Sequence, residues 1–79
     1  MHNKEIDKER VQMCKNFRLL REKKRLSIKE LSKASGVSEY MIANFEKEII
    51  TQKANVTHIF KLCSFFEIPV YKIFSPLEP

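Results

Sequence analysis

Apolar side chains recur along this chain at intervals of three and four positions, which is the spacing of one face of an α-helix. No stretch of several residues alternates between apolar and polar side chains as a strand does. The one short candidate for a strand is the pair Ile49 and Ile50. The pattern therefore predicts an all-α fold, a compact bundle of five short helices. The expected helices cover residues 7–24, two segments within residues 27–46, residues 56–66 and a short last segment within residues 70–74.

The first, fourth and last helices carry apolar stripes that predict the core. With Asp7 as its N-cap, the first helix is expected to bury Met13, Cys14, Phe17 and Leu20. With Asn55 as its N-cap, the fourth is expected to bury Val56, Ile59, Phe60, Cys63 and Phe66. The last is expected to bury Val70, Ile73 and Phe74. A length of 79 residues suits one domain, here residues 7–74, with a flexible N-terminus over residues 1–6 and a tail over residues 75–79.

Residues 27–46 predict two short helices around a tight turn. Ser27 followed by Glu30 forms a capping box at the start of the first helix. Gly36 is the one glycine of the chain, and it stands where a helix end needs a positive φ. Ser38 caps the second helix, whose inward positions are Met41, Ile42 and Phe45. Its outward positions, which a helix-turn-helix offers to the major groove, are Glu39, Tyr40, Ala43, Asn44 and Lys47.

The charge is unevenly distributed. The chain has fifteen Lys and Arg against ten Asp and Glu, a net charge of +5, and residues 15–33 alone hold eight basic and two acidic residues. Such a region is either a solvated helix surface or a contact for a polyanion, and its position beside a helix-turn-helix favours the second interpretation.

Several classes of chemistry find no support in the sequence. Cys14 and Cys63 lack metal-ligand spacing and fit buried core positions better than a disulfide. His2 and His58 have no ligand partners at metal-binding spacing, and one glycine is too few for a phosphate-cradling loop. We therefore expect no enzyme, metal, cofactor or small-molecule ligand. The charged N-terminus and the lack of an apolar run of about eighteen residues predict a soluble, cytoplasmic protein with no membrane contact.

From about residue 17 to residue 74 the chain resembles the Xre/Cro-type, lambda-repressor-like, helix-turn-helix family. The resemblance is carried by Arg21, residues 27–31, the turn at residues 36–38, Ile42, Glu46 and the closing segment IFKLCSFFEIPVYKIF. It implies that Arg21 pairs with Glu46 and ties the first helix to the end of the recognition helix, the alternative being two unrelated surface charges. Arg21, Gly36 and Glu46 are the structural residues of the expected site.

The resemblance also implies how DNA is contacted. The expected base or sugar-edge contacts are Ser38, Glu39, Tyr40, Ala43 and Asn44. The expected phosphate contacts are Lys29, Lys33, Lys47 and Lys53. Asparagine can bond adenine through two hydrogen bonds, and glutamate can accept from cytosine N4. The tyrosine would pack on a thymine methyl group or reach a phosphate.

The chain departs from the family pattern at several positions. Ile28 stands where the family often has a phosphate-binding glutamine, and the groove-facing set has no arginine, which predicts modest affinity per monomer. Lys24 or Arg25 replaces a Gly or Asn at the end of the first helix, Glu48 replaces a Gly, and Ala54 replaces a Pro. Within the loop of residues 47–54, Ile49 and Ile50 are expected to tuck into the core, or alternatively to form a patch at a dimer contact.

The resemblance predicts a sequence-specific transcriptional regulator of bacterial or phage type that binds double-stranded DNA, as a homodimer on a palindromic operator. In the cell it would be associated with the bacterial nucleoid or encoded by a phage. The alternative is a protein-interaction module on the same fold, antitoxin-like or partner-binding, with weak or no DNA binding. The two are separated by whether the basic region and Asn44 share one surface.

Overall fold

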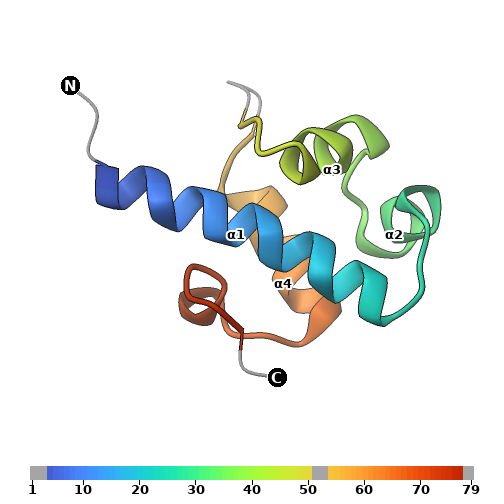
Figure 1. The fold of residues 1–79 in the computed structure, drawn as a ribbon. Helices are drawn as coiled ribbons and strands as arrows, with labels where there is room; N and C mark the ends of the chain where they lie inside the picture. The colour runs from blue at the N-terminus through green and yellow to red at the C-terminus, as the bar shows by residue number, and fades with distance from the viewer. Residues whose placement is uncertain (1–3, 51–53, 78–79) are drawn as a thin grey trace.

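The longest helix of the molecule, α1, spans Lys4–Lys23 and crosses the front of the view in Figure 1. The computed structural model describes residues 4–50 and 54–77, with side chains from Lys8 onward. The elements that follow are α2 (Ile28–Ser35), α3 (Glu39–Glu46), α4 (Val56–Phe66) and a single 3-10 turn, η1 (Val70–Lys72). In Figure 1, α3 lies above α1, whereas η1 lies below it.

The all-α class is confirmed for the described segments, which contain helices and no strand, but the expected count of five helices is wrong. The last segment forms one 3-10 turn after Pro69, and Pro76 disfavours a helical conformation at Ser75. The start of α1 is also corrected. It begins at Lys4, so Asp7 lies within the helix rather than at its N-cap. Residues 4–6 of the N-terminal segment that was expected to be flexible belong to α1, while residues 1–3 and 78–79 lie outside the described residues.

The core is built from all four helices and the C-terminal segment. Its buried side chains are Met13, Cys14, Phe17, Leu31, Val37, Met41, Ile42, Phe45, Leu62, Cys63, Phe66 and Ile73. Phe17 of α1 and Phe45 of α3 stack at its centre, with ring centroids 6.0 Å apart. Burial of large apolar side chains is the main favourable term in folding, so this cluster fixes α3 against α1.

The buried face of α4 is only partly the expected one: Cys63 and Phe66 are buried as expected, and Ile59 packs against the core. Val56 and Phe60 are 65% and 57% exposed, whereas Leu62 is buried together with Cys63 and Phe66. Leu62 and Phe66 are four residues apart and face the core, which turns Val56 and Phe60 toward solvent. The expectation that Ile49 and Ile50 tuck into the core is also wrong, because they are 48% and 39% exposed.

Among the residues that the structure describes, four take positive φ angles, which only glycine adopts without strain. Gly36 ends α2 at φ +81°, as the sequence predicts. Arg25 at +57° and Glu48 at +63° occupy two places where the family pattern has Gly or Asn, and Glu67 at +56° ends α4. Arg25, Glu48 and Glu67 therefore bear backbone strain at the helix ends where they lie.

Asn16 is the one polar residue among the fully buried residues that the structure describes. Its Nδ2 donates to the carbonyl oxygens of Ile73 at 2.7 Å and Ser75 at 2.8 Å, and its Oδ1 accepts from Gln12 Nε2 at 3.0 Å. This buried polar position was not predicted from the sequence. The available signal was its position three residues after Met13 and four before Leu20, on the inward face of α1.

Candidate nucleic-acid interface

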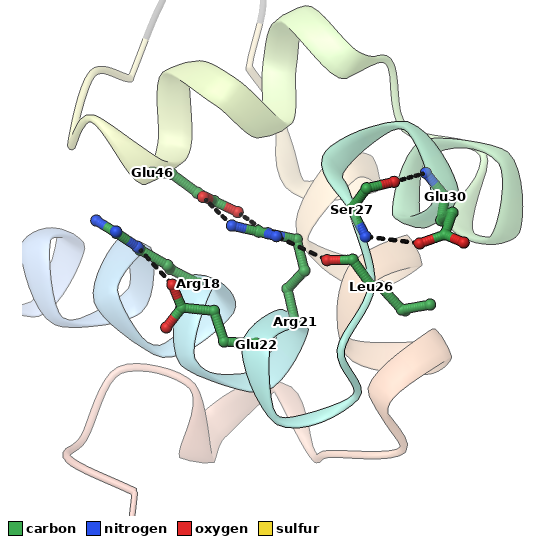
Figure 2. Close-up of polar contacts among 7 residues, drawn as sticks. All are labelled: Arg18, Arg21, Glu22, Leu26, Ser27, Glu30 and Glu46. Carbon is green, nitrogen blue, oxygen red and sulfur yellow. Dashed lines mark hydrogen bonds and ion pairs between the residues drawn. The ribbon is translucent and has the colours of Figure 1, made fainter.

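The α2–turn–α3 unit is held by local hydrogen bonds at each helix start. Ser27 Oγ accepts from the Glu30 N–H at 3.0 Å, and the Glu30 carboxylate accepts from the Ser27 N–H at 2.8 Å, which completes the capping box (Figure 2). These hydrogen bonds lower the pKa of Glu30. At the start of α3, Ser38 Oγ accepts from the Met41 N–H at 3.1 Å. The capping residues Ser27 and Ser38 therefore define where α2 and α3 begin.

The orientation of α3 is set by its apolar face and by an ion pair at its end. Met41, Ile42 and Phe45 are buried. Arg21 of α1 donates to both carboxylate oxygens of Glu46, at 2.5 and 2.9 Å, and also to the carbonyl oxygen of Leu26 at 2.7 Å (Figure 2). The hydrogen bond with Glu46 raises the pKa of Arg21. One side chain thus joins α1, the connection before α2, and the end of α3.

The expected base-contact residues differ in their exposure. Glu39 and Tyr40, in the first turn of α3, are exposed, and Tyr40 is 62% exposed. Ser38 is exposed with its oxygen engaged as the cap, and Ala43 is half-buried. Asn44 is half-buried as a residue, but its Nδ2 is inaccessible and has no hydrogen-bond partner within the described part of the chain. In this conformation Asn44 Nδ2 cannot donate to a base, so adenine recognition requires its side chain to rotate.

The expected phosphate contacts lie on exposed surfaces where the structure describes them. Lys29 and Lys33 are exposed on α2, and their four-residue separation places them on one face of it. Lys47 is exposed at the end of α3, and Lys53 lies outside the described residues.

Part of the basic region is engaged within the protein. Arg18 pairs with Glu22 at 3.1 Å, Arg21 pairs with Glu46, and Lys24 Nζ lies 5.8 Å from the ring centroid of Phe65 on α4. Of these three cations, only Arg21 is largely shielded from water, at 15% exposure, whereas Arg18 and Lys24 remain exposed. The lysines of α2 are the part of the basic region that belongs to the helix-turn-helix unit itself.

The remaining candidate groups have structural roles. His58 Nδ1 accepts from the Asn55 N–H at 3.1 Å and completes a second capping box, at the start of α4. Cys14 and Cys63 are free and buried. No group of three or more potential metal ligands occurs among the residues that the structure describes.

Comparison with known protein families agrees with this arrangement. A family model described as helix-turn-helix matches residues 17–73. The chain belongs to the Xre/lambda-repressor-like helix-turn-helix family. No curated protein and no solved structure matches the chain.

Membership in this helix-turn-helix family implies DNA binding, and the match includes the α2–turn–α3 unit. The match begins at residue 17, so residues 4–16 of α1 precede it. None of the helices in the described segments is both long and apolar enough to cross a membrane.

Proposed function

We propose that the chain is a sequence-specific DNA-binding regulator of the Xre/Cro type, which places α3 in the major groove of its operator. The observation that carries this proposal is the fixed presentation of α3. Its inner face is buried and its C-terminal end is held by Arg21, while Glu39 and Tyr40 protrude from its first turn. Recognition helices of this motif contact base edges with their N-terminal residues.

The roles follow from the chemistry of the exposed groups. Glu39 accepts from cytosine N4, and Tyr40 packs on a thymine methyl group or bonds a phosphate. Ser38 and Ala43 contact the sugar or base edge beside them. Asn44 reads adenine only after its side chain has rotated out of its inaccessible position.

Phosphate contacts from Lys29, Lys33 and Lys47 supply salt-dependent affinity and fix the position of the domain on the duplex, with Lys53 as a further candidate. One domain of this kind binds modestly, since Glu39 repels phosphates and Ile28 offers no donor. A homodimer on a palindromic operator compensates, with half-sites separated by about one helical turn, roughly 34 Å. A regulator of this type, bacterial or phage-encoded, acts on DNA in the cytoplasm.

The proposal is tested by selecting random double-stranded DNA on the purified protein at a low and a moderate salt concentration. We expect an enriched palindrome whose binding falls steeply with salt. Tyr40→Ala should weaken or change the preference, whereas Leu19→Gln, on the exposed surface of α1, should not. Absence of binding at the lower salt concentration would contradict the proposal.

One observation favours a second function, a protein-interaction module. The exposed first turn of α3 presents an acid and an aromatic ring, Glu39 and Tyr40, and the helix contains no basic residue. Such a surface suits a protein with basic and apolar side chains. The same selection separates the two functions, since a pure interaction module retains no DNA even at low salt.

A further inference from the structure

Between the end of α2 and the middle of α4 lies an open hollow of about 380 Å³ that the core does not fill. Its lining comes from these two helices, and consists of Ala34, Ser35, Phe60, Lys61, Ser64 and Phe65. The residues of α3 that are expected to contact bases do not line it. The hollow is therefore a surface separate from the exposed first turn of α3.

The hollow results from small residues on α2 that face large ones on α4. Helix α2 ends with Ala34 and Ser35 and is followed by Gly36. On the α4 side Phe60 projects between the helices, and the small side chains opposite leave its ring 57% exposed. One exposed ring needs no explanation, but a ring that borders a hollow is typical of a binding surface.

The ring of Phe65 forms a second, fixed wall of the hollow. It makes an edge-to-face contact with buried Phe66, with ring centroids 5.1 Å apart and an interplanar angle of 72°. Lys24, in the connection after α1, places its Nζ 5.8 Å from the centroid of the Phe65 ring. Both kinds of contact are favourable and hold the ring in place. The hollow thus combines one fixed ring with the freely exposed ring of Phe60.

Two lysines give the hollow a positive charge. Lys61 belongs to the lining, and its side chain extends over the end of α2. Its Cδ and Nζ each lie 3.9 Å from the position that a β-carbon on Gly36 would occupy. Lys61 and Lys24 are exposed, and neither forms an ion pair within the described part of the chain. Both ammonium groups therefore remain available to an anionic partner.

Acidic side chains of the chain itself are directed elsewhere. Glu22 pairs with Arg18 at 3.1 Å, and the Glu30 carboxylate accepts from the Ser27 N–H in the capping box. Glu67 follows the hollow in sequence but lines a different groove, beside the C-terminal segment. None of these three acids lines the hollow. The charge that borders it is accordingly of one sign.

We propose that this hollow binds an acidic segment of another protein. The segment places an aromatic or large aliphatic side chain beside Phe60 and directs its carboxylates to Lys61 and Lys24. The hydroxyl of Ser64 adds a donor for the same carboxylates. Complementary charge selects the partner, and burial of the Phe60 ring supplies affinity. The inference goes beyond the proposed function, because it holds whether or not α3 contacts DNA.

Two other occupants fit the hollow less well. A second copy of this chain would bring like charges together, since the chain carries a net charge of +5 and the hollow itself is bordered by lysines. Single-stranded nucleic acid is bound by stacking successive bases on aromatic rings. Here Phe65 is half-buried with Lys24 over its ring, so Phe60 alone is open to a base.

The first test selects a displayed library of random short peptides on the full chain at low salt. We expect the enriched peptides to be rich in Asp and Glu and to contain at least one aromatic or large aliphatic residue. A synthetic, fluorescently labelled peptide of the enriched sequence then gives the affinity by anisotropy. Its binding should weaken as salt rises, because the lysines of the hollow are exposed.

Variants of the full chain test whether this peptide occupies the hollow. Phe60→Gln and Lys61→Glu should each weaken its binding by roughly tenfold or more. The matched controls are Leu19→Gln and Lys15→Glu, which make the same chemical changes at exposed positions of α1 and should leave binding nearly unchanged. All four substitutions replace exposed helical residues, and circular dichroism verifies that each variant folds.

Nuclear magnetic resonance of the isotope-labelled chain locates the peptide. We expect it to shift the amide signals of residues 34–36 and 60–65 more than those of residues 38–44. Enrichment of basic or uncharged peptides, or of none, would overturn the proposal. So would binding that both Phe60→Gln and Lys61→Glu leave intact, amide shifts confined to α3, or tighter binding of an oligothymidylate than of the peptide in the hollow.

Discussion

The guanidinium of Arg21 on α1 donates two hydrogen bonds to the carboxylate of Glu46, the last residue of α3, and a third to the carbonyl oxygen of Leu26. Both side chains are largely shielded from water, at 15% and 10% exposure. Only the planar fork of an arginine satisfies the carboxylate in this way. The pair therefore acts as a brace between the first helix and the recognition helix.

Loss of this brace should destabilise the fold. We expect Arg21→Ala to lower the free energy of unfolding by roughly 2–4 kcal/mol, because it leaves a shielded carboxylate and a carbonyl oxygen without their donor. Arg21→Lys should recover part of the loss, since lysine restores the charge without the two-pronged geometry. Chemical denaturation monitored by circular dichroism measures both changes.

The control is Arg18→Ala. Arg18 pairs with Glu22 one turn later, at 58% and 52% exposure, so its removal should change stability by less than about 0.5 kcal/mol. Equal effects at the two arginines would show that the Arg21–Glu46 pair contributes no more than a surface contact.

The strained connections offer a second prediction. Arg25→Gly and Glu67→Gly should each stabilise the chain, by about 0.5–1 kcal/mol, because glycine relieves the left-handed backbone strain. Gly36→Ala should have the opposite sign and a cost of about 1 kcal/mol. A methyl group at Gly36 meets only the side chain of Lys61, at 3.9 Å, so that cost comes from the backbone and not from a clash. Thermal unfolding of the three variants compares them, and a stabilising Gly36→Ala would refute this account.

The helix boundaries that could be predicted from the sequence are those set by residues close together in the chain. The pairing of Ser27 with Glu30, the single glycine at Gly36 and the cap at Ser38 each specify one helix boundary within a short segment. The structure has these boundaries because capping is decided by adjacent residues. The expected pairing of Arg21 with Glu46 came instead from the family resemblance, and the structure contains it.

Features that depend on tertiary packing were missed. On α4 the stripe beginning at Val56 and the stripe containing Leu62 have similar spacing, and packing against α2 and η1 selects the second. Periodicity alone cannot choose between them when most positions of a helix are apolar. Likewise, the partners of Asn16 are 57 and 59 residues away, beyond the reach of any local pattern.

The candidate site likewise has some features that local sequence sets and others that tertiary packing sets. The exposed first turn of α3 follows from local helix geometry. The inaccessible Nδ2 of Asn44 and the contact of Lys24 with Phe65 depend on how the helices pack. The sequence therefore predicts the position of α3 and its exposed first turn, but not which of its polar atoms packing leaves accessible.

Asn16 supports a third prediction, about the C-terminal segment. Asn16→Ala removes the donor of two carbonyl oxygens and should cost roughly 1–3 kcal/mol. Hydrogen exchange should accelerate at backbone amides of residues 72–75, which this side chain holds against α1, more than within α3. Gln12→Ala is the control and should have a much smaller effect, because among the described residues the Gln12 side chain hydrogen-bonds only to Asn16 Oδ1. Uniform acceleration over the whole chain would argue against a local clamp.

The buried thiols give a fourth prediction, for alkaline pH. Burial, assisted by the charge of Glu48, raises the pKa of Cys14 from 9.0 to about 11, and burial also raises the pKa of Cys63. The folded chain holds these protons more tightly than the unfolded chain. The stability that results is therefore complete below pH 9.0 and is lost as the pH rises through the folded-state values.

We expect the midpoint of chemical denaturation to fall between about pH 9 and 11, with a shallower decline in Cys14→Ala. Both thiols should react slowly with an aromatic disulfide reagent until the chain is unfolded. Rapid reaction of the folded protein would place at least one thiol at the surface.

The last prediction concerns how DNA is read, and it compares two residues of the helix-turn-helix unit. Lys33→Ala should weaken binding about equally on all sequences and reduce the slope of log affinity against log salt by about 1. Asn44→Ala should instead alter the preference at one base pair, by roughly 1–3 kcal/mol.

Asn44 differs from the lysine because its Nδ2 is inaccessible and has no hydrogen-bond partner among the residues that the structure describes. Rotation toward a base would give this donor a hydrogen-bond partner. For the same reason Asn44→Ala should leave the stability of the free domain nearly unchanged. Binding to a panel of single-base operator variants, with Lys29→Ala as the matched phosphate-contact control, measures these effects. If Asn44→Ala weakens all variants equally, as the lysine substitutions do, Asn44 does not contact a base and recognition falls to Glu39 and Tyr40.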